Sequence, residues 1–363
     1  IDLEDEQPPV HFRVPERSED GGWIDIVDAL GVSLPSDCLV TEKPIELFCL
    51  PQAVFRVRPV TRCAASLPGH GEPLISVKFS PNGSTLASGS GDKTVRLWDT
   101  KSQLPLQTLN GHQHWVLCIA WSHDGNKIAS ACKQGIVSYI CILCFILIWE
   151  YDSDTNKFRL FKKLTGHKQW INALAWRPLH LETPSRLLAS AGRDASIRIW
   201  DIIKSHTLFV LTGHTASVSA LRLYLEILFF KVTDIRWSGN DLIYSASQDR
   251  TIKVWRTNDG VLCRTLEGHA HWINTLASNV DYVLRIGSFS PEEDSKQMSI
   301  SNAQSVEARK IAKKQYEKML NCQPERLVSG SDDFTLFLWE PAIKKQPLAR
   351  LTGHQQLINQ VQF

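Results

Sequence analysis

Short apolar runs recur along the chain, separated by turns rich in glycine, aspartate and asparagine. Four of these runs end in tryptophan and read TVRLW, SIRIW, TIKVW and TLFLW. Side chains that branch at Cβ favour strands, and the glycine and aspartate positions between the runs favour tight turns. The pattern therefore predicts an all-β chain of short strands, grouped four to a repeating unit.

A Gly-His pair opens each unit. In the first unit His70 precedes Phe79 by 9 positions and Trp98 by 28. Repeats of this length with these two marks are typical of WD40 units, each of which forms one four-stranded blade of a β-propeller. Five units are complete and a sixth only begins, so we expect an incomplete, C-terminally truncated propeller of about five full blades plus a stub. The pairs are Gly69-His70, Gly111-His112, Gly166-His167, Gly213-His214, Gly268-His269 and Gly353-His354.

Four polar positions in a unit have a spacing that predicts one hydrogen-bonded tetrad. A buried indole N–H needs an acceptor, and a serine hydroxyl, an imidazole and a carboxylate can form a chain of hydrogen bonds from it. We interpret these residues as structural rather than catalytic. They are His70, Ser88, Asp92 and Trp98 in the first unit, His167, Ser190, Asp194 and Trp200 in the third, His214, Ser245, Asp249 and Trp255 in the fourth, and His269, Ser329, Asp333 and Trp339 in the fifth.

The second unit departs from this pattern, because it offers Gln134 or Gly135 where the aspartate is expected. Its tetrad is therefore predicted to be weaker. The second and fourth units also contain apolar insertions, within IVSYICILCFILIW and LYLEILFFKVTDIR. We expect these to strain their blades and to be foreign to the working protein.

The fifth unit contains the longest insertion, at about residues 284–324. Its segment NAQSVEARKIAKKQYEKML has the charge and apolar spacing of an exposed amphipathic helix. One face of that helix is basic and suits RNA phosphate, although a solvated charged face is the alternative. This basic face comprises Arg309, Lys310, Lys313 and Lys314.

Three tryptophans, Trp115, Trp170 and Trp272, each follow a Gly-His histidine by three positions. Aromatic residues at the entry of an inner strand could act as binding hot spots on one rim of the propeller. They could equally pack between blades.

Composition limits the function classes without selecting one. A net charge of +2 over 363 residues argues against a protein that coats a polyanion, and nine scattered cysteines argue against a disulfide-bridged secreted fold. Outside the tetrads there is no phosphate loop, nucleophile set or metal-ligand cluster, so we predict neither an enzyme nor a resident metal or cofactor. No membrane span or small-molecule substrate is expected.

Several longer stretches are more specific than the repeat marks: PQAVFRVRPVTRC, GHQHWVLCIAWSHDG, SASQDRTIKVWRTNDGVLCRTLEGHAHWIN, DYVLRIGSFSP and SGSDDFTLFLWEP. These stretches resemble the Notchless family of WD40-repeat proteins. The resemblance covers about residues 40–363. It implies a partial ubiquitin-like (β-grasp) domain at residues 1–58, preceding the propeller at 59–363. Strands are expected in VHFRV and PIELFCL of the first domain.

The resemblance also implies partners and a place in the cell. Members of the family assemble the large (60S) ribosomal subunit in the nucleolus and nucleus, and a midasin-type AAA ATPase grips their N-terminal domain through a metal-ion-dependent adhesion site. The glutamate that completes the partner's Mg²⁺ shell corresponds to Glu42, flanked by Thr41 and Lys43, which position the loop. Carboxylate oxygen is the ligand that Mg²⁺ prefers.

Two functions from different classes follow. The first is a non-enzymatic assembly factor whose propeller docks on the pre-60S particle and whose N-terminal domain is engaged for release. The alternative is a WD40 adaptor in signalling, recruiting a Notch-type receptor tail or a ubiquitin-ligase substrate.

Overall fold

The computed structural model describes residues 10–15, 23–26, 48–51, 63, 65–133, 144–214, 232–289 and 305–363. The chain divides into two compact units, Ile1–Ser66 and Leu67–Phe363. Each unit is described by itself.

The first unit contains a three-stranded antiparallel sheet. Strand β1 (Val10–Pro15) lies at its centre, between β2 (Trp23–Ile26) and β3 (Phe48–Pro51). The strands expected in VHFRV and PIELFCL are present, the second only over its last residues, whereas β2 lies where the sequence had indicated turns. Glu42, Thr41 and Lys43 fall outside the described residues.

The second unit contains five four-stranded antiparallel sheets, the blades, each built from strands consecutive in sequence except where an insertion intervenes. Blade 1 comprises β4 (Leu74–Phe79), β5 (Thr85–Ser90), β6 (Thr94–Asp99) and β7 (Pro105–Asn110). Blade 2 comprises β8 (Val116–Trp121), β9 (Lys127–Cys132), β10 (Cys144–Asp152) and β11 (Lys157–His167). Blade 3 comprises β12 (Ile171–Trp176), β13 (Leu187–Gly192), β14 (Ser196–Asp201) and β15 (His206–Thr212). Blade 4 comprises β16 (Val232–Trp237), β17 (Leu242–Ser247), β18 (Thr251–Arg256) and β19 (Leu262–Glu267). Blade 5 comprises β20 (Ile273–Ser278), β21 (Leu327–Ser331), β22 (Leu336–Trp339) and β23 (Ala349–Leu351).

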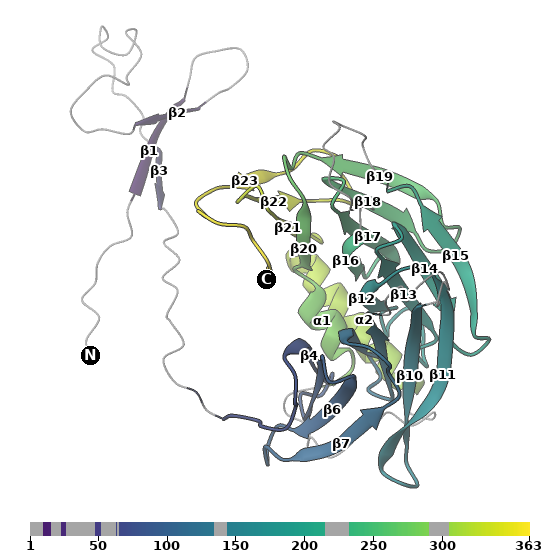
Figure 1. Ribbon diagram of the computed structural model, residues 1–363. Helices are drawn as coiled ribbons and strands as arrows, with labels where there is room; N and C mark the ends of the chain where they lie inside the picture. The colour runs from purple at the N-terminus through teal and green to yellow at the C-terminus, as the bar shows by residue number, and fades with distance from the viewer. Residues whose placement is uncertain are drawn as a thin grey trace, which may run out of the picture. The chain divides into compact units, whose positions relative to one another are not determined.

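The blades follow one another around an arc, with the first strand of each beside the first strand of the next (Figure 1). Apolar side chains fill the seams, as where Leu97 and Leu109 of blade 1 share a cluster with Ile119 of blade 2. Each side chain of this size contributes about 1.5–3 kcal/mol when fully buried. A hydrogen bond also crosses this seam, because the Trp121 indole donates to the Lys78 carbonyl at 3.1 Å.

The segment after β23 occupies the place where a sixth blade would begin. Asn274 of blade 5 donates to the Ile358 carbonyl at 3.0 Å, just as Asn172 of blade 3 donates to the Val232 carbonyl of blade 4 at 3.0 Å. Residues 352–363 form no strand. The expected stub is therefore a mostly exposed segment held through Ile358 rather than a paired strand.

The long insertion is docked on the propeller instead of standing free. It contains α1 (Asp281–Ile286) and α2 (Ser305–Cys322). The expected amphipathic helix is present and has an exposed face, but its other face is covered, because Ala308, Ala312 and Tyr316 are 6%, 4% and 5% exposed. These residues are four apart, so they share one face, and two alanines allow that face to pack closely against Leu179 of blade 3. Neither of these two helices has the length and apolar character needed to span a membrane.

The two apolar insertions are described only in part. The end of the run in the second unit forms β10, which pairs with β9 and β11 and is almost wholly buried. Residues 134–143 and 215–231, which hold the rest of both insertions as well as Gln134 and Gly135, lie outside the described residues.

Candidate docking surface

The predicted tetrad of blade 1 is present. The Trp98 indole donates to Ser88 Oγ at 2.8 Å, and His70 Nε2 lies 2.8 Å from the same oxygen. His70 Nδ1 is 2.7 Å from Asp92 Oδ2. The chain of bonds joins strands β5 and β6 to the Gly-His turn before β4, and it fixes the end of the blade.

The tetrads of blades 3, 4 and 5 repeat this geometry. Their histidine-to-aspartate distances are 2.7–3.0 Å, and their tryptophans donate to serine at 2.7–2.8 Å. A further member was missed in the sequence, since a serine or threonine two positions after each aspartate donates to its second carboxylate oxygen. The signal was the D-x-S/T spacing. These residues are Thr94, Ser196, Thr251 and Thr335.

Hydrogen bonding keeps the tetrad carboxylates ionised. Burial alone would raise their pKa, but the hydroxyl and imidazole donors outweigh it and lower the pKa of Asp92, Asp194 and Asp333 to about 2. The same balance lowers the pKa of Asp249. Every polar atom of these groups serves the fold, which leaves no tetrad nucleophile or base open to a substrate.

Blade 2 has the histidine, serine and tryptophan but lacks the aspartate contact. His112 Nε2 lies 2.7 Å from Ser130 Oγ, to which Trp149 donates at 2.9 Å. His112 Nδ1 is buried with no hydrogen-bond partner in the described part of the blade. The ring stacks on Phe145 with centroids 5.8 Å apart, and burial lowers the pKa of His112 to about 4. Among the described residues, this tetrad thus has one hydrogen bond fewer than the others.

Two of the three predicted tryptophans come together at the tetrad end of the blades. Lys133 Nζ lies 5.0 Å from the ring centre of Trp115 and 4.2 Å from that of Trp170. The Arg193 guanidinium lies 4.8 Å from the Trp170 ring. These four residues, which we call the Trp-cation ladder, span the loops between blades 1 and 3. Cations held against aromatic faces are partly desolvated, which strengthens their attraction for an anion.

The two interpretations of the tryptophans each apply to a different residue. Trp170 is only partly exposed and packs against the apolar cluster shared by blades 2 and 3, so it is largely structural. Trp115 is 48% exposed and offers an open ring. Trp272 lies at the entry of blade 5. Its ring centroid is 5.2 Å from that of His271, and it is not part of the Trp-cation ladder.

The basic residues of α2 also differ in their contacts. Arg309 donates to the carbonyls of His180 and Leu181 at 2.9 Å each, so it anchors the helix to blade 3. Lys310, Lys313 and Lys314 are exposed, and Lys313 is 3.7 Å from Glu317. Arg309 is thus exposed like the three lysines, but its guanidinium is held by backbone carbonyls.

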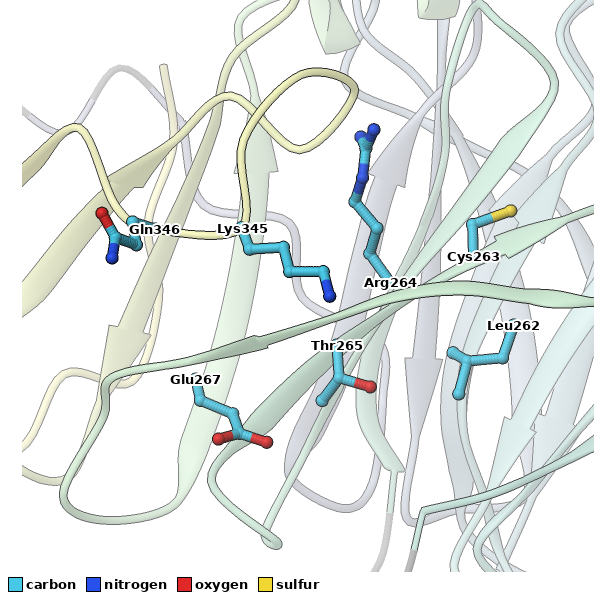
Figure 2. A pocket seen from close by; sticks show the side chains of 7 residues that line it. All are labelled: Leu262, Cys263, Arg264, Thr265, Glu267, Lys345 and Gln346. Atoms are coloured by element: carbon cyan, nitrogen blue, oxygen red, sulfur yellow. The ribbon is translucent and has the colours of Figure 1, made fainter.

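An open groove of about 490 Å³ runs along the outer strand β19 and the turn that carries Lys345 and Gln346 (Figure 2). Arg264 in this groove donates to the Pro341 carbonyl at 2.6 Å and so links blades 4 and 5. Within the described ranges, no group of three histidine, cysteine, aspartate or glutamate residues could hold a metal ion. The groove brings together no set of residues that points to a reaction.

Comparisons with known proteins agree with this geometry. The family model "WD domain, G-beta repeat" matches residues 61–99, 103–139, 158–201 and 205–256. Among solved structures, the crystal structure of the RRP9 WD40 repeats superposes with a TM-score of 0.53 at 21% identity, covering 79% of this chain and 65% of that chain. This likeness shows the fold alone. The chain is a WD40-repeat β-propeller protein.

Curated relatives identify the family. The chain is 43% identical to Protein Notchless of Drosophila melanogaster over 89% of this chain and 60% of the relative. It is 38% identical to Ribosome assembly protein 4 of Saccharomyces cerevisiae over 94% of this chain and 61% of the relative. It is 43% identical to the Notchless protein homolog of Arabidopsis thaliana over 92% of this chain and 64% of the relative. The chain belongs to the Notchless family, and it spans less than two thirds of the length of these relatives.

Proposed function

We propose that this chain is a non-enzymatic assembly factor of the large (60S) ribosomal subunit, acting in the nucleolus and nucleus. Its similarity to proteins named Ribosome assembly protein 4, over most of the chain, carries the proposal. The tetrads support a binding role, because their polar atoms are used in holding the blades together.

The Trp-cation ladder is the part of the propeller best suited to dock on a pre-ribosomal particle. Trp115 combines an open aromatic ring with a neighbouring lysine that is fixed by its contact with Trp170. Exposed tryptophan beside a held cation is the composition of a binding hot spot, since both contribute strongly once the partner excludes water. Trp272 would belong to a separate contact on blade 5.

We infer that the N-terminal unit is the handle for release. In this proposal a midasin-type AAA ATPase captures the loop that carries Glu42, whose carboxylate completes the coordination of Mg²⁺ in the partner's adhesion site. Thr41 and Lys43 position that loop. The chemistry is sound because Mg²⁺ takes carboxylate oxygen and readily accepts one ligand from a second protein.

Sucrose-gradient sedimentation of cell extracts tests the docking step. The tagged chain is expected to sediment with large pre-ribosomal particles, and Trp115→Ala is expected to shift at least about tenfold more of it to light fractions, as a hot-spot loss of about 1.4 kcal/mol or more predicts. The matched control is Phe334→Ala, an exposed aromatic residue of blade 5 outside the ladder. Recovery of the unaltered chain in light fractions alone would favour the signalling adaptor instead.

A pull-down with the isolated adhesion-site domain tests the handle. Binding is expected to require Mg²⁺ and to be lost in Glu42→Ala and Glu42→Asp, while sedimentation with pre-ribosomal particles persists. Capture that is unchanged in both variants would contradict the role of Glu42.

A further inference from the structure

The long insertion is mounted rigidly across blades that are not its own. Although it belongs to blade 5, Tyr316 of α2 stacks on His180 of blade 3 with centroids 4.6 Å apart. The Tyr316 hydroxyl donates to buried Glu325 at 3.2 Å, and Ser238 of blade 4 donates to the same carboxylate at 2.9 Å. Together with the Arg309 anchor, these contacts fix the orientation of the helix, so its outer face has a defined position on the propeller.

Several basic residues near the insertion are paired with carboxylates. Arg177 pairs with Asp241 at 2.6 Å and with Glu182 at 3.6 Å, Arg186 pairs with Asp201, and Lys127 lies 3.6 Å from Glu150. On α2 the only ion pair seen in the described ranges is Lys313 with Glu317.

The remaining lysines of α2 lie in one row. Lys310, Lys314 and Lys318 are exposed, stand four residues apart and have no carboxylate within ion-pair distance in the part of the chain that the structure describes. At a rise of 1.5 Å per residue, neighbours in the row are about 6 Å apart along the helix. These three lysines of α2 thus form one exposed stripe of positive charge, which we call the lysine row.

The chemistry of the lysine row favours nucleic acid over protein. Protein interfaces are depleted in lysine and depend on aromatic or arginine anchors, and the single aromatic residue of α2, Tyr316, is buried. Lysine is a flexible point charge that suits phosphate oxygens whatever the base sequence. A fixed helix also loses little conformational entropy on binding.

We propose that the lysine row binds the phosphate backbone of structured RNA. This deepens the proposed assembly role, on which it rests for the source of the RNA, by naming the chemical class that the insertion contacts. Contact occurs at the opposite end of the blades from the Trp-cation ladder, because loops after first strands and loops after second strands lie at opposite ends of an antiparallel sheet.

Fluorescence anisotropy with a labelled RNA hairpin, titrated at several salt concentrations with the full chain, tests the inference. The variant is Lys310→Gln/Lys314→Gln/Lys318→Gln, which keeps helix-forming residues. The control is Lys157→Gln/Lys204→Gln/Lys344→Gln, which removes the same charge from exposed positions in or next to turns of three blades. The helix variant is expected to bind about tenfold more weakly at low salt, and its salt dependence is expected to lose about 2 units of slope, whereas the control changes little.

Equal losses in both variants would overturn the proposal in favour of net charge alone, and so would unchanged binding in the helix variant. Selective loss of binding to a polyglutamate probe, with RNA binding intact, would overturn it in favour of an acidic protein. Sedimentation of the helix variant with pre-ribosomal particles separates the two proposals. If it still co-sediments while RNA binding proves insensitive to the lysines, the lysine row fails and the assembly role stands.

Discussion

Blades 2 and 3 differ at one residue of the tetrad, and the difference shows what the aspartate does. In blade 3, Asp194 accepts from the His167 ring, from the Ser196 hydroxyl and from the Lys168 amide. In blade 2, His112 keeps its serine but its Nδ1 is buried without a partner among the described atoms. Phe145 stacks on the ring and supplies packing where blade 3 has a hydrogen bond.

The tetrad therefore consists of two sets of hydrogen bonds, one made by the serine and one made by the aspartate. The serine links the tryptophan to the histidine, and this part survives in both blades. The aspartate links the Gly-His turn to the hairpin turn through hydrogen bonds. Among the described residues of blade 2, no carboxylate makes this link. Because an orphaned buried polar atom costs about 1–3 kcal/mol, blade 2 is expected to be the less stable of the two.

The largest effect is expected when blade 3 is made to resemble blade 2. Asp194→Ala removes the acceptor of His167 and of three further donors, and we expect it to destabilise the protein by about 3 kcal/mol. Urea denaturation, with hydrogen exchange of β13 and β14 as a local probe, measures this loss. Asp154→Ala, at an exposed turn position, serves as the control and should stay within about 0.5 kcal/mol. Equal stability of the two variants would show that the aspartate adds nothing to the blade.

A smaller effect is expected from acid, and His112 of blade 2 contributes a defined part of it. The pKa of His112 is about 4 in the folded chain against 6.5 without burial, so the unfolded chain binds the proton more readily. Its contribution is complete above pH 6.5 and is lost as the pH falls towards 4, which amounts to about 2 kcal/mol at pH 5. The Asp194 carboxylate, with a pKa of about 2, keeps its contribution throughout this range.

Unfolding measured at pH 7 and pH 5 checks this expectation. In His112→Gln, whose amide can still contact Ser130 but does not titrate, the part of the pH dependence due to His112 is expected to vanish. An unchanged difference between the two pH values in this variant would assign the effect to other groups.

The smallest effect is a gain. Ser130 stands four positions before Gln134, the spacing at which every complete tetrad has its aspartate, although Gln134 itself lies outside the described residues. Gln134→Asp is expected to supply the missing acceptor to His112 and to stabilise the chain by about 1 kcal/mol. The same substitution should raise the pKa of His112, which NMR titration of the ring can follow. A loss of stability with no change in that pKa would mean that the residue cannot reach the ring.

A second contrast concerns the inner strands at the two ends of the arc. Val116 and Ile171, which open the first strands of blades 2 and 3, are fully buried, whereas Leu74 at the same position of blade 1 is 54% exposed. The repeats are alike in sequence, so burial here depends on the neighbouring blade rather than on the residue itself. Ile358, which takes this position after blade 5, is buried against Gly330.

The blades could be predicted from the amino-acid sequence. Each blade depends on contacts between residues that are close in the chain, and on residue types that few others can replace. The tryptophan at the end of the third strand, the serine ten positions before it and the Gly-His turn identify one another by spacing alone. The absence of the aspartate from the second unit could be predicted for the same reason, because the other units have it at a constant spacing.

The packing of the blades, and not the local sequence, determines which exposed side chains are held by contacts with other blades. Arg309 is one of five basic residues on α2, yet it donates to carbonyls that lie about 130 residues away in the chain. Trp115 and Trp170 have the same local pattern, but Lys133 and the core shared by blades 2 and 3 give them different exposure. Local spacing fixes what a residue can do within its own blade, whereas its partners in other blades depend on how the blades pack, and no periodicity in the chain records that packing.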